Sequence, residues 1–241
     1  MDHVFIMKFV TLVEDTTKCE LGAEHGLSIY AETEKHKLLF DVGTTDLFIK
    51  NAKALGIDLS QVDTVVISHG HNDHGGGLDA FLAINDHAVI YLQEKAFNDH
   101  YTAKKTGPEY IGLNQALKTP PQVKLLDGSY VIDDELQIYS HVAGEIYETN
   151  KNLLKEDKTR DDFVHEQHLL IQGSKNVLLM GCGHKGVLNI IGQCPAAPVF
   201  IFTAQEQVSA CRNRLLWIWL RICRMQFTIQ DIVPVIKHWR S

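Results

Sequence analysis

Cysteine is scarce in this 241-residue sequence, and its few cysteines do not form a paired pattern. Disulfide scaffolds of secreted proteins use an even set of closely spaced cysteines, and many zinc sites use Cys-x-x-Cys pairs. The five cysteines here are odd in number and contain no such pair: Cys19, Cys182, Cys194, Cys211 and Cys223. The sequence therefore predicts a reduced, cytoplasmic protein.

Long hydrophobic runs are also missing. The longest late apolar run spans residues 215–220, which is far too short to cross a bilayer. The first 15 residues place acidic side chains on both sides of an apolar run and lack a small-residue cleavage site, so they predict a strand and not a signal peptide. We expect neither a membrane span nor a secretory leader.

An excess of positive charge is absent as well. The formal net charge is −7, which argues against general affinity for nucleic acids or anionic membrane surfaces. No flavin or nicotinamide signature and no Cys-rich electron-transfer module is present, so hydrolytic chemistry is favoured over redox chemistry. We expect a globular protein that acts on a small molecule, and the oligomeric state stays open.

The most informative feature is a cluster of three histidines and one aspartate within six residues: His69, His71, Asp73 and His74. Residues 62–67 before it form an apolar, β-branched run that is typical of a buried strand. Three glycines follow at positions 75–77. The cluster is therefore expected on a loop at a strand end, where a rigid scaffold can hold a metal. A solvated polar loop is the weaker interpretation, because chance would rarely supply both the strand and the glycine turn.

The spacing within this cluster predicts two neighbouring metal sites. Imidazole nitrogens and carboxylate oxygens are common ligands of divalent metals. His69 and His71 are two residues apart and can converge on one ion. Asp73 and His74 are adjacent, so their side chains diverge from the first pair and can reach a second ion.

The segment His-Gly-His-Asn-Asp-His-Gly-Gly-Gly resembles the signature of metallo-β-lactamase-fold hydrolases. Residues 37–45 resemble their strand that ends in an acidic turn. Residues 177–190, which contain Gly-Cys-Gly-His, resemble the branch that includes dihydropterin-ribofuranosyl-aminobenzene-phosphate synthases of the methanopterin pathway. The resemblance covers residues 1 to about 190. It implies an α/β fold, the αββα sandwich, in which two mixed β-sheets lie face to face with helices outside.

The same resemblance implies two divalent ions, with zinc as the first expectation and iron or manganese as alternatives. The ions would activate a water that attacks an ester or phosphoester. His69, His71 and His184 would hold the first ion. Asp73 and His74 would hold the second, and Asp73 would also accept a hydrogen bond from the attacking water.

Other polar residues follow predicted strands. Asp41 is expected to orient a ligand histidine and also to cap the helix that follows. Cys182 stands near the position where relatives often place a bridging aspartate, but a buried structural cysteine is the more frequent outcome, so we do not count it as a ligand. His141 and Glu145 lie in a turn where many relatives carry a metal histidine. We expect neither of them to bind a metal.

Periodicity and turn residues predict the other elements. We expect strands within residues 4–13, 27–33, 37–42, 88–92, 131–139, 166–172 and 175–180, and helices over 45–55, 78–84 and 187–191. Residues 98–119 are predicted to form a polar insertion, either a lid that selects substrate or a surface excursion. Lys104, Lys105 and Tyr101 in it could meet a phosphate, although a solvated charge pair is favoured. Residues 151–162 are predicted to form a charged, mobile loop.

The family resemblance ends near residue 191. We therefore predict a single domain over residues 1–241, with a family-like part (1–191) and an atypical tail (192–241). Relatives carry a Gly-Gly-Phe-His-Leu segment and later a Tyr-Thr-Gly-His-Cys-Thr-Gly segment, whose histidine is a late metal ligand. Neither segment is present here.

The genetic code suggests why. Degenerate codons for residues 226–235, read from the third base of each codon, can encode Ile-Tyr-Tyr-Thr-Gly-His-Cys-Thr-Gly, and the same shift over residues 198–203 permits Gly-Phe-His-Leu-Tyr. We hypothesise that the tail is frameshifted. Resequencing the 3′ end would reject this hypothesis if the DNA contains no such alternative frame.

Three functions compete. A metallohydrolase or the related pterin-pathway synthase leads, because the histidine cluster is intact. A metal-binding but catalytically impaired protein follows from the missing late histidine, which predicts that only one of the two ions binds well. A metal-free binding domain is disfavoured by the same intact cluster. Metal content and hydrolysis of a generic phosphodiester would separate the three.

Overall fold

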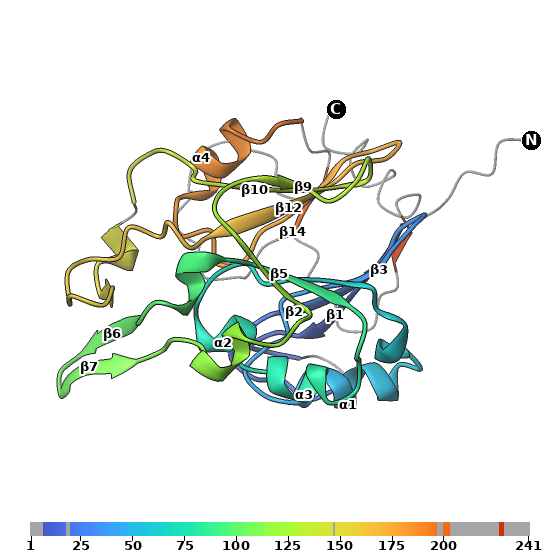
Figure 1. Cartoon of the computed structure of the whole chain (residues 1–241), viewed down its shortest axis with the longest axis horizontal. Coiled ribbons are helices and arrows are strands. Elements are labelled where there is room, and N and C mark those ends of the chain that lie inside the picture. Colours follow the sequence, from blue (N-terminus) through green and yellow to red (C-terminus); the bar gives the residue numbers. More distant parts are fainter. Residues whose placement is uncertain (1–6, 18–19, 147, 197–199, 203–226, 229–241) are drawn as a thin grey trace, which may run out of the picture.

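The protein folds as two β-sheets that lie face to face with helices on their outer faces (Figure 1). The structure is a computed structural model that describes residues 7–17, 20–146, 148–196, 200–202 and 227–228. Within these residues the larger sheet has seven strands in the order β15-β1-β2-β3-β4-β5-β8, and the smaller has five in the order β14-β13-β12-β10-β9. This arrangement confirms the predicted αββα sandwich.

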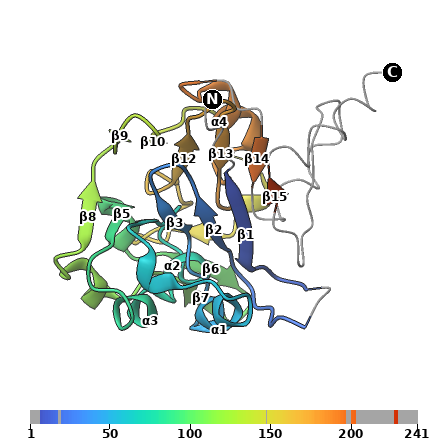
Figure 2. The same cartoon turned by 90° about the vertical axis from the view of Figure 1, so that its right-hand side faces the viewer.

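The larger sheet is mixed. Its first four strands pair antiparallel, and β3, β4, β5 and β8 pair parallel. Figure 2 shows β1, β2 and β3 side by side, with the predicted hairpin joining the last two. The strands are β15 (Phe227–Thr228), β1 (Lys8–Val13), β2 (Ser28–Glu32), β3 (Lys37–Phe40), β4 (Thr64–Val66), β5 (Val89–Gln93) and β8 (Val123–Leu126).

The smaller sheet is antiparallel except for the β13–β14 pair, so it is mixed as well. Its strands are β14 (Phe200–Phe202), β13 (Val177–Leu179), β12 (Gln167–Ile171), β10 (Leu136–Ser140) and β9 (Tyr130–Val131). The hairpins predicted within residues 131–139 and 166–180 are both present. Most of the predicted atypical tail lies outside the described residues.

Three apolar layers hold the sandwich together. Phe48 and Phe81 bring helices α1 and α3 against the outer face of the larger sheet. Phe40 and Leu169 are completely buried between the two sheets. Ile190 of helix α4 covers the outer face of the smaller sheet. The helices and short 3-10 turns are α1 (Leu47–Ala54), α2 (Asn72–Gly75), α3 (Leu78–Leu82), α4 (Val187–Gly192), η1 (Leu59–Gln61), η2 (Glu94–Phe97), η3 (Gln115–Lys118) and η4 (Glu148–Asn150).

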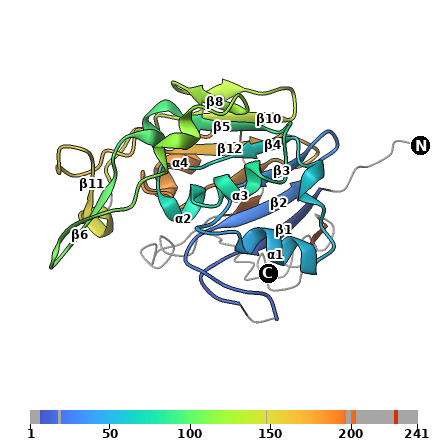
Figure 3. The ribbon, with the colours of Figure 1, turned by 60° about the horizontal axis from the view of Figure 1, so that its bottom comes forward.

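A third sheet extends from one end of the sandwich (Figure 3). It contains β11 (Leu153–Leu154), β6 (Tyr101–Lys104) and β7 (Gly107–Tyr110) in that order. Residues 151–162 are mostly turns and loop, as predicted, but β11 within them pairs with β6 and Asp161 is buried. Polar groups of this segment form hydrogen bonds with residues far away in the sequence, as Asp161 does with His100. The charge pattern did not predict these contacts.

Two polar side chains of the third sheet have local partners. Lys104 forms an ion pair with Glu109, and the Tyr101 hydroxyl donates to Asp99. These contacts support the solvated charge pair over a phosphate site. None of the helices in the described ranges has the length and apolar character that a bilayer crossing requires.

One buried histidine of the smaller sheet gives a stability prediction. His168 is fully buried, and neither ring nitrogen has a hydrogen-bond partner among the described residues. Burial therefore lowers its pKa to about 3. The unfolded chain takes up the proton near pH 6.5 while the folded chain stays neutral, so stability is complete above that pH and is lost as the pH falls toward 3.

We expect the wild-type protein, but not His168→Leu, to lose about 2 kcal/mol of unfolding free energy at this site between pH 7.5 and 5. Urea denaturation of both proteins with a metal chelator present measures the difference. Parallel pH profiles for the two proteins would contradict the prediction.

Candidate metal centre

The histidine loop and its partners meet because parallel strands end at the same edge of the larger sheet. Strands β3 and β4 pair in parallel with Phe40 opposite Val66. Asp41 follows β3, and the loop from Ser68 to His74 follows β4. The turn after β13 in the facing sheet approaches the same edge. Its Gly181 fits closely, since a Cβ there would lie 2.2 Å from the Ser68 hydroxyl oxygen.

A buried carboxylate sets the ring orientation of His69 through a serine. The Ser68 hydroxyl donates to Asp41 Oδ2 over 2.8 Å and therefore accepts from His69 Nδ1, which lies 2.9 Å away. Protonation at Nδ1 leaves His69 Nε2 with a free lone pair. That atom lies 3.0 Å from His71 Nδ1. Two imidazole nitrogens this close are well placed to bind one cation, for which His69 Nε2 already has a free lone pair.

Asp41 also orients His74, as the sequence predicted. His74 Nδ1 lies 2.6 Å from Asp41 Oδ2, and both residues are almost completely buried. The other ring nitrogen, Nε2, lies 3.2 Å from the Cys182 sulfur. Asp41 has a positive φ of 60°, which a short polar residue tolerates better than most. The carboxylate thus fixes one ring atom so that the opposite one points into the site.

His184 is also held in a fixed orientation, by residues of η4 and of the loop between β11 and β12. Its Nδ1 contacts Asn150 Oδ1 over 3.1 Å, while its backbone N–H donates to Glu166 over 2.7 Å. Phe163 stacks on the ring at 4.4 Å between centroids. His184 Nε2 is buried and has no hydrogen-bond partner within the described part of the chain. It therefore has the position and the free lone pair of a metal ligand.

The structure brings the predicted ligands together, in two neighbouring groups. The ring centroids of His69, His71 and His184 lie 4.5 to 5.2 Å apart. Candidate ligand atoms of His69, Cys182 and His184 lie within 4.8 Å of one another, and so do those of Asp73, His74 and Cys182.

Cys182 belongs to both groups, whereas the sequence analysis does not count it as a ligand. The sequence favours a structural cysteine because most buried thiols have no ligand role. The preceding strand end and its adjacent histidine were the available signals. A thiolate between two groups of ligands can bind either ion or both.

The histidines of the site differ in the direction in which their pKa values are shifted. Burial and the neighbouring histidines lower the pKa of His69 and of His71 well below the ordinary value. The same two causes lower the pKa of His184 to about 3. For His74, burial is outweighed by the negative charges of Cys182, Asp41 and Asp73, which raise its pKa well above the usual range. Neutral imidazoles on one side and a charge-rich region on the other are suited to binding cations.

Asp73 lies at the outer side of the site. Its side chain keeps 17% exposure, and one of its oxygens lies 3.4 Å from Nε2 of the exposed His25. His25 was not singled out in the sequence, because it lies within a polar loop without a motif. His141 and Glu145 are exposed and join neither group of candidate ligands among the described residues.

A further buried cluster includes His71: His71, His100, Asp161 and His165. Its members come from the histidine loop, the start of β6 and the segment before β12. Asp161 and His165 were not predicted, since the sequence interpretation placed them in a mobile loop and at a strand edge. The four-residue spacing and the apolar strand that follows were the only local clues.

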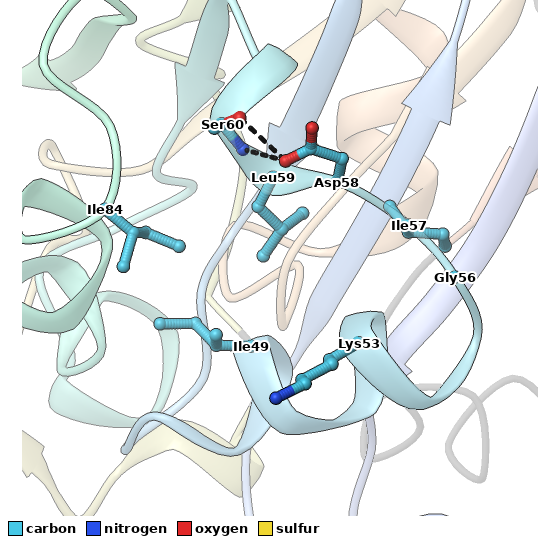
Figure 4. A pocket seen from close by; sticks show the side chains of 8 residues that line it. All are labelled: Ile49, Lys53, Gly56, Ile57, Asp58, Leu59, Ser60 and Ile84. Carbon is cyan, nitrogen blue, oxygen red and sulfur yellow. Dashed lines mark hydrogen bonds between the residues drawn. The ribbon is translucent and has the colours of Figure 1, made fainter.

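An apolar pocket elsewhere on the surface is not a second candidate for this chemistry (Figure 4). It has a volume of about 340 Å³ and lies between α1 and η1. Its carboxylate, Asp58, accepts two hydrogen bonds from Ser60, and its lining includes no histidine or cysteine.

Comparisons with known proteins agree with this geometry. A sequence model of the metallo-beta-lactamase superfamily matches residues 21–150. The uncharacterized protein MJ0448 of Methanocaldococcus jannaschii is 29% identical over 75% of this chain and 71% of its own length. The 7,8-dihydropterin-6-methyl-4-(beta-D-ribofuranosyl)-aminobenzene-5'-phosphate synthase of the same organism is 28% identical over 77% of this chain and 70% of its own.

A solved structure shows the same fold. The crystal structure of Tm1679, described as a metal-dependent hydrolase of the beta-lactamase superfamily, has a TM-score of 0.64 and 28% sequence identity. The alignment covers 76% of this chain and 69% of that one.

Proposed function

Because this chain belongs to the metallo-beta-lactamase superfamily, we propose that it is a metal-dependent hydrolase of ester or phosphoester bonds. The observation that carries the proposal is the convergence of buried ring nitrogens of His69, His71 and His184 near the end of β4. His184 Nε2 has no partner among the described residues, and His69 Nε2 and His71 Nδ1 lie 3.0 Å apart. These donors are suited to a divalent transition metal, and we propose zinc as the first choice.

We propose that His69, His71 and His184 hold the first ion, and that Asp73 and His74 hold the second. Cys182 contributes its sulfur between the two groups. Bound divalent ions in such a site supply Lewis acidity and lower the pKa of a water molecule.

The chain's own residues then orient the reactants. Asp73 is the candidate ligand that reaches solvent, so its carboxylate is placed to accept a hydrogen bond from the attacking water. Asp41, Asn150 and Glu166 keep the imidazoles in fixed orientations behind it. The burial of the imidazoles strengthens the electrostatic contribution of each charged group beside them.

A second candidate function is a metal-binding protein with impaired catalysis. The observation that favours it is the ligand set of the second group, which has three members among the described residues: Asp73, His74 and Cys182. The late histidine segment expected from the family is missing from the sequence. Such a chain would bind the first ion more tightly than the second.

Metal content and hydrolysis, measured on the same preparation, separate the two functions. We expect a purified wild-type chain to bind at least one zinc ion per molecule and to hydrolyse bis(p-nitrophenyl) phosphate or an aryl ester, with activity lost after chelation and restored by zinc. Tight zinc binding without turnover of either substrate would favour the impaired protein. Absence of zinc binding by a folded chain would contradict both proposals.

A narrower proposal is a synthase reaction like that of the pterin-pathway relative. It rests on the 28% identity and on the Gly-Cys-Gly-His turn at residues 181–184. Assaying that relative's reaction with zinc-loaded protein tests it. We also propose a small-molecule substrate and a cytoplasmic location, the latter from the cysteine usage alone.

A further inference from the structure

The hydrogen bonds in the cluster beside His71 indicate which ring nitrogens of His100 and His165 carry a proton. His165 Nδ1 accepts from the Gly70 N–H over 2.9 Å, so its proton must lie on Nε2. That N–H donates to Asp161 Oδ2 over 3.2 Å. His100 Nδ1 lies 3.0 Å from the same oxygen and donates to it as well. The backbone amide therefore fixes the proton position of His165, and the shared Asp161 oxygen fixes that of His100.

Both carboxylate oxygens of Asp161 already accept hydrogen bonds. Its second oxygen, Oδ1, accepts from the Phe163 N–H over 2.7 Å. Hydrogen bonds from His100 and His165 lower the pKa of Asp161 despite its burial, so it remains a carboxylate. With His165 bonded at both nitrogens, a separate ion in this cluster would have to break existing hydrogen bonds.

Two buried nitrogens remain unpaired. They are His100 Nε2 and His71 Nε2, and neither has a hydrogen-bond partner within the described ranges. The two rings meet edge-on with centroids 5.6 Å apart. His100 Nε2 lies against the histidine loop, because a Cβ on Gly70 would lie only 2.8 Å from it.

The proton positions make His71 Nε2 and His100 Nε2 a matching donor and acceptor. A neutral His100 with its proton on Nδ1 has a lone pair at Nε2. If His71 offers the lone pair of Nδ1 to an ion, its proton must lie on Nε2. One atom is then a donor and the other an acceptor, in a region where burying either one without a partner is unfavourable.

We propose that His100, Asp161 and His165 form a buried relay that positions His71 as a metal ligand. When an ion binds His71 Nδ1, the Nε2–H of His71 would donate to His100 Nε2; the two atoms are not hydrogen-bonded to each other in this structure. His100 Nδ1–H donates to Asp161, which also accepts from His165, and the other ring nitrogen of His165 accepts from the Gly70 amide. This proposal rests on the proposed metal-binding function of His71. The relay also connects the third sheet to the site, since His100 directly precedes β6 and the Asn72 N–H donates to Ile111, just after β7.

Zinc affinity tests the relay without using activity. Zn²⁺ is titrated against a chromophoric chelator with the wild-type chain, His100→Leu, His100→Gln and Asp161→Asn. Residues behind metal ligands typically contribute 10- to 100-fold in affinity, so we expect that loss in His100→Leu and in Asp161→Asn. His100→Gln keeps one acceptor and one donor and should recover most of the affinity. His168→Leu, which removes another buried histidine from the smaller sheet, should bind zinc like the wild type.

Nitrogen-15 NMR of histidine-labelled wild-type protein reads the proton positions directly. In the zinc-loaded chain we expect His71 and His165 protonated at Nε2 and His100 protonated at Nδ1. This readout holds even if His100→Leu fails to fold.

Three results would overturn the relay: unchanged zinc affinity in a folded His100→Leu, a His71 proton on Nδ1, or an additional zinc ion that His100→Leu lacks. If the wild-type chain binds no zinc, the proposed function fails first. If it binds zinc and His100→Leu binds it equally well, only the relay fails.

Discussion

Asp41→Ala is expected to lower the unfolding free energy of the metal-free protein by about 3–5 kcal/mol. The carboxylate accepts from the Ser68 N–H over 2.7 Å, from the Ser68 hydroxyl over 2.8 Å and contacts His74 over 2.6 Å. Alanine would leave these buried groups without their partner. It would also place a residue that disfavours positive φ at a φ of 60°.

Urea denaturation with a chelator present measures this loss. Asp86→Ala is the matched control, because the Asp86 side chain is fully exposed and its removal should change stability by less than about 0.5 kcal/mol. Asp41→Asn keeps the side-chain shape and should fall between the two, since an amide cannot accept from all of these donors. A loss below about 1 kcal/mol in Asp41→Ala would show that Asp41 is not the organising partner of the site.

Cys182→Ala should produce the largest change in metal binding. Its sulfur is within reach of both groups of candidate ligands, so we expect the variant to retain one fewer ion than the wild type and its zinc affinity to fall at least about 100-fold. Hydrolysis should fall with the lost ion. Elemental analysis and chelator competition measure the change.

The second cysteine of the described residues supplies the control for this variant. Cys194 is half-buried near the end of α4, and its thiol donates to the Ala196 carbonyl over 3.1 Å. Cys194→Ala should keep the full metal content. Cys182→Asp restores an anionic ligand and should regain part of it. If Cys182→Ala binds zinc as the wild type does, the sulfur is structural, as the sequence first suggested.

The sequence predicted the parts of the site that depend on short segments. His69, His71 and His74 share one loop with an apolar strand before it and glycines behind it, so the spacing alone indicated two neighbouring metal sites. Asp41 could be placed next to this loop because a strand-helix-strand unit makes its two strands parallel. The observed contact between Asp41 and His74 confirms that reasoning.

Contacts between distant segments could not be predicted in the same way. Asn150 reaches His184 across 34 residues and His165 reaches Gly70 across 95, and no local pattern specifies either pairing. Their burial depends on how β11, β12 and β13 pack, which periodicity does not determine. The role of Cys182 could not be predicted for a related reason, since the chemistry of a thiol depends on which charges surround it in the folded chain.

The separation between the two halves of the metal centre also affects the order of events during synthesis. His74 and Cys182, which contact each other, lie 108 residues apart in the sequence. At about 5–20 residues per second, a ribosome needs roughly 5–20 s to add that length. During this interval the growing chain presents the first histidines without the later sulfur and imidazole. We therefore expect tight metal capture only after residue 184 has emerged, so the ions available to the nearly complete chain decide which metal it holds.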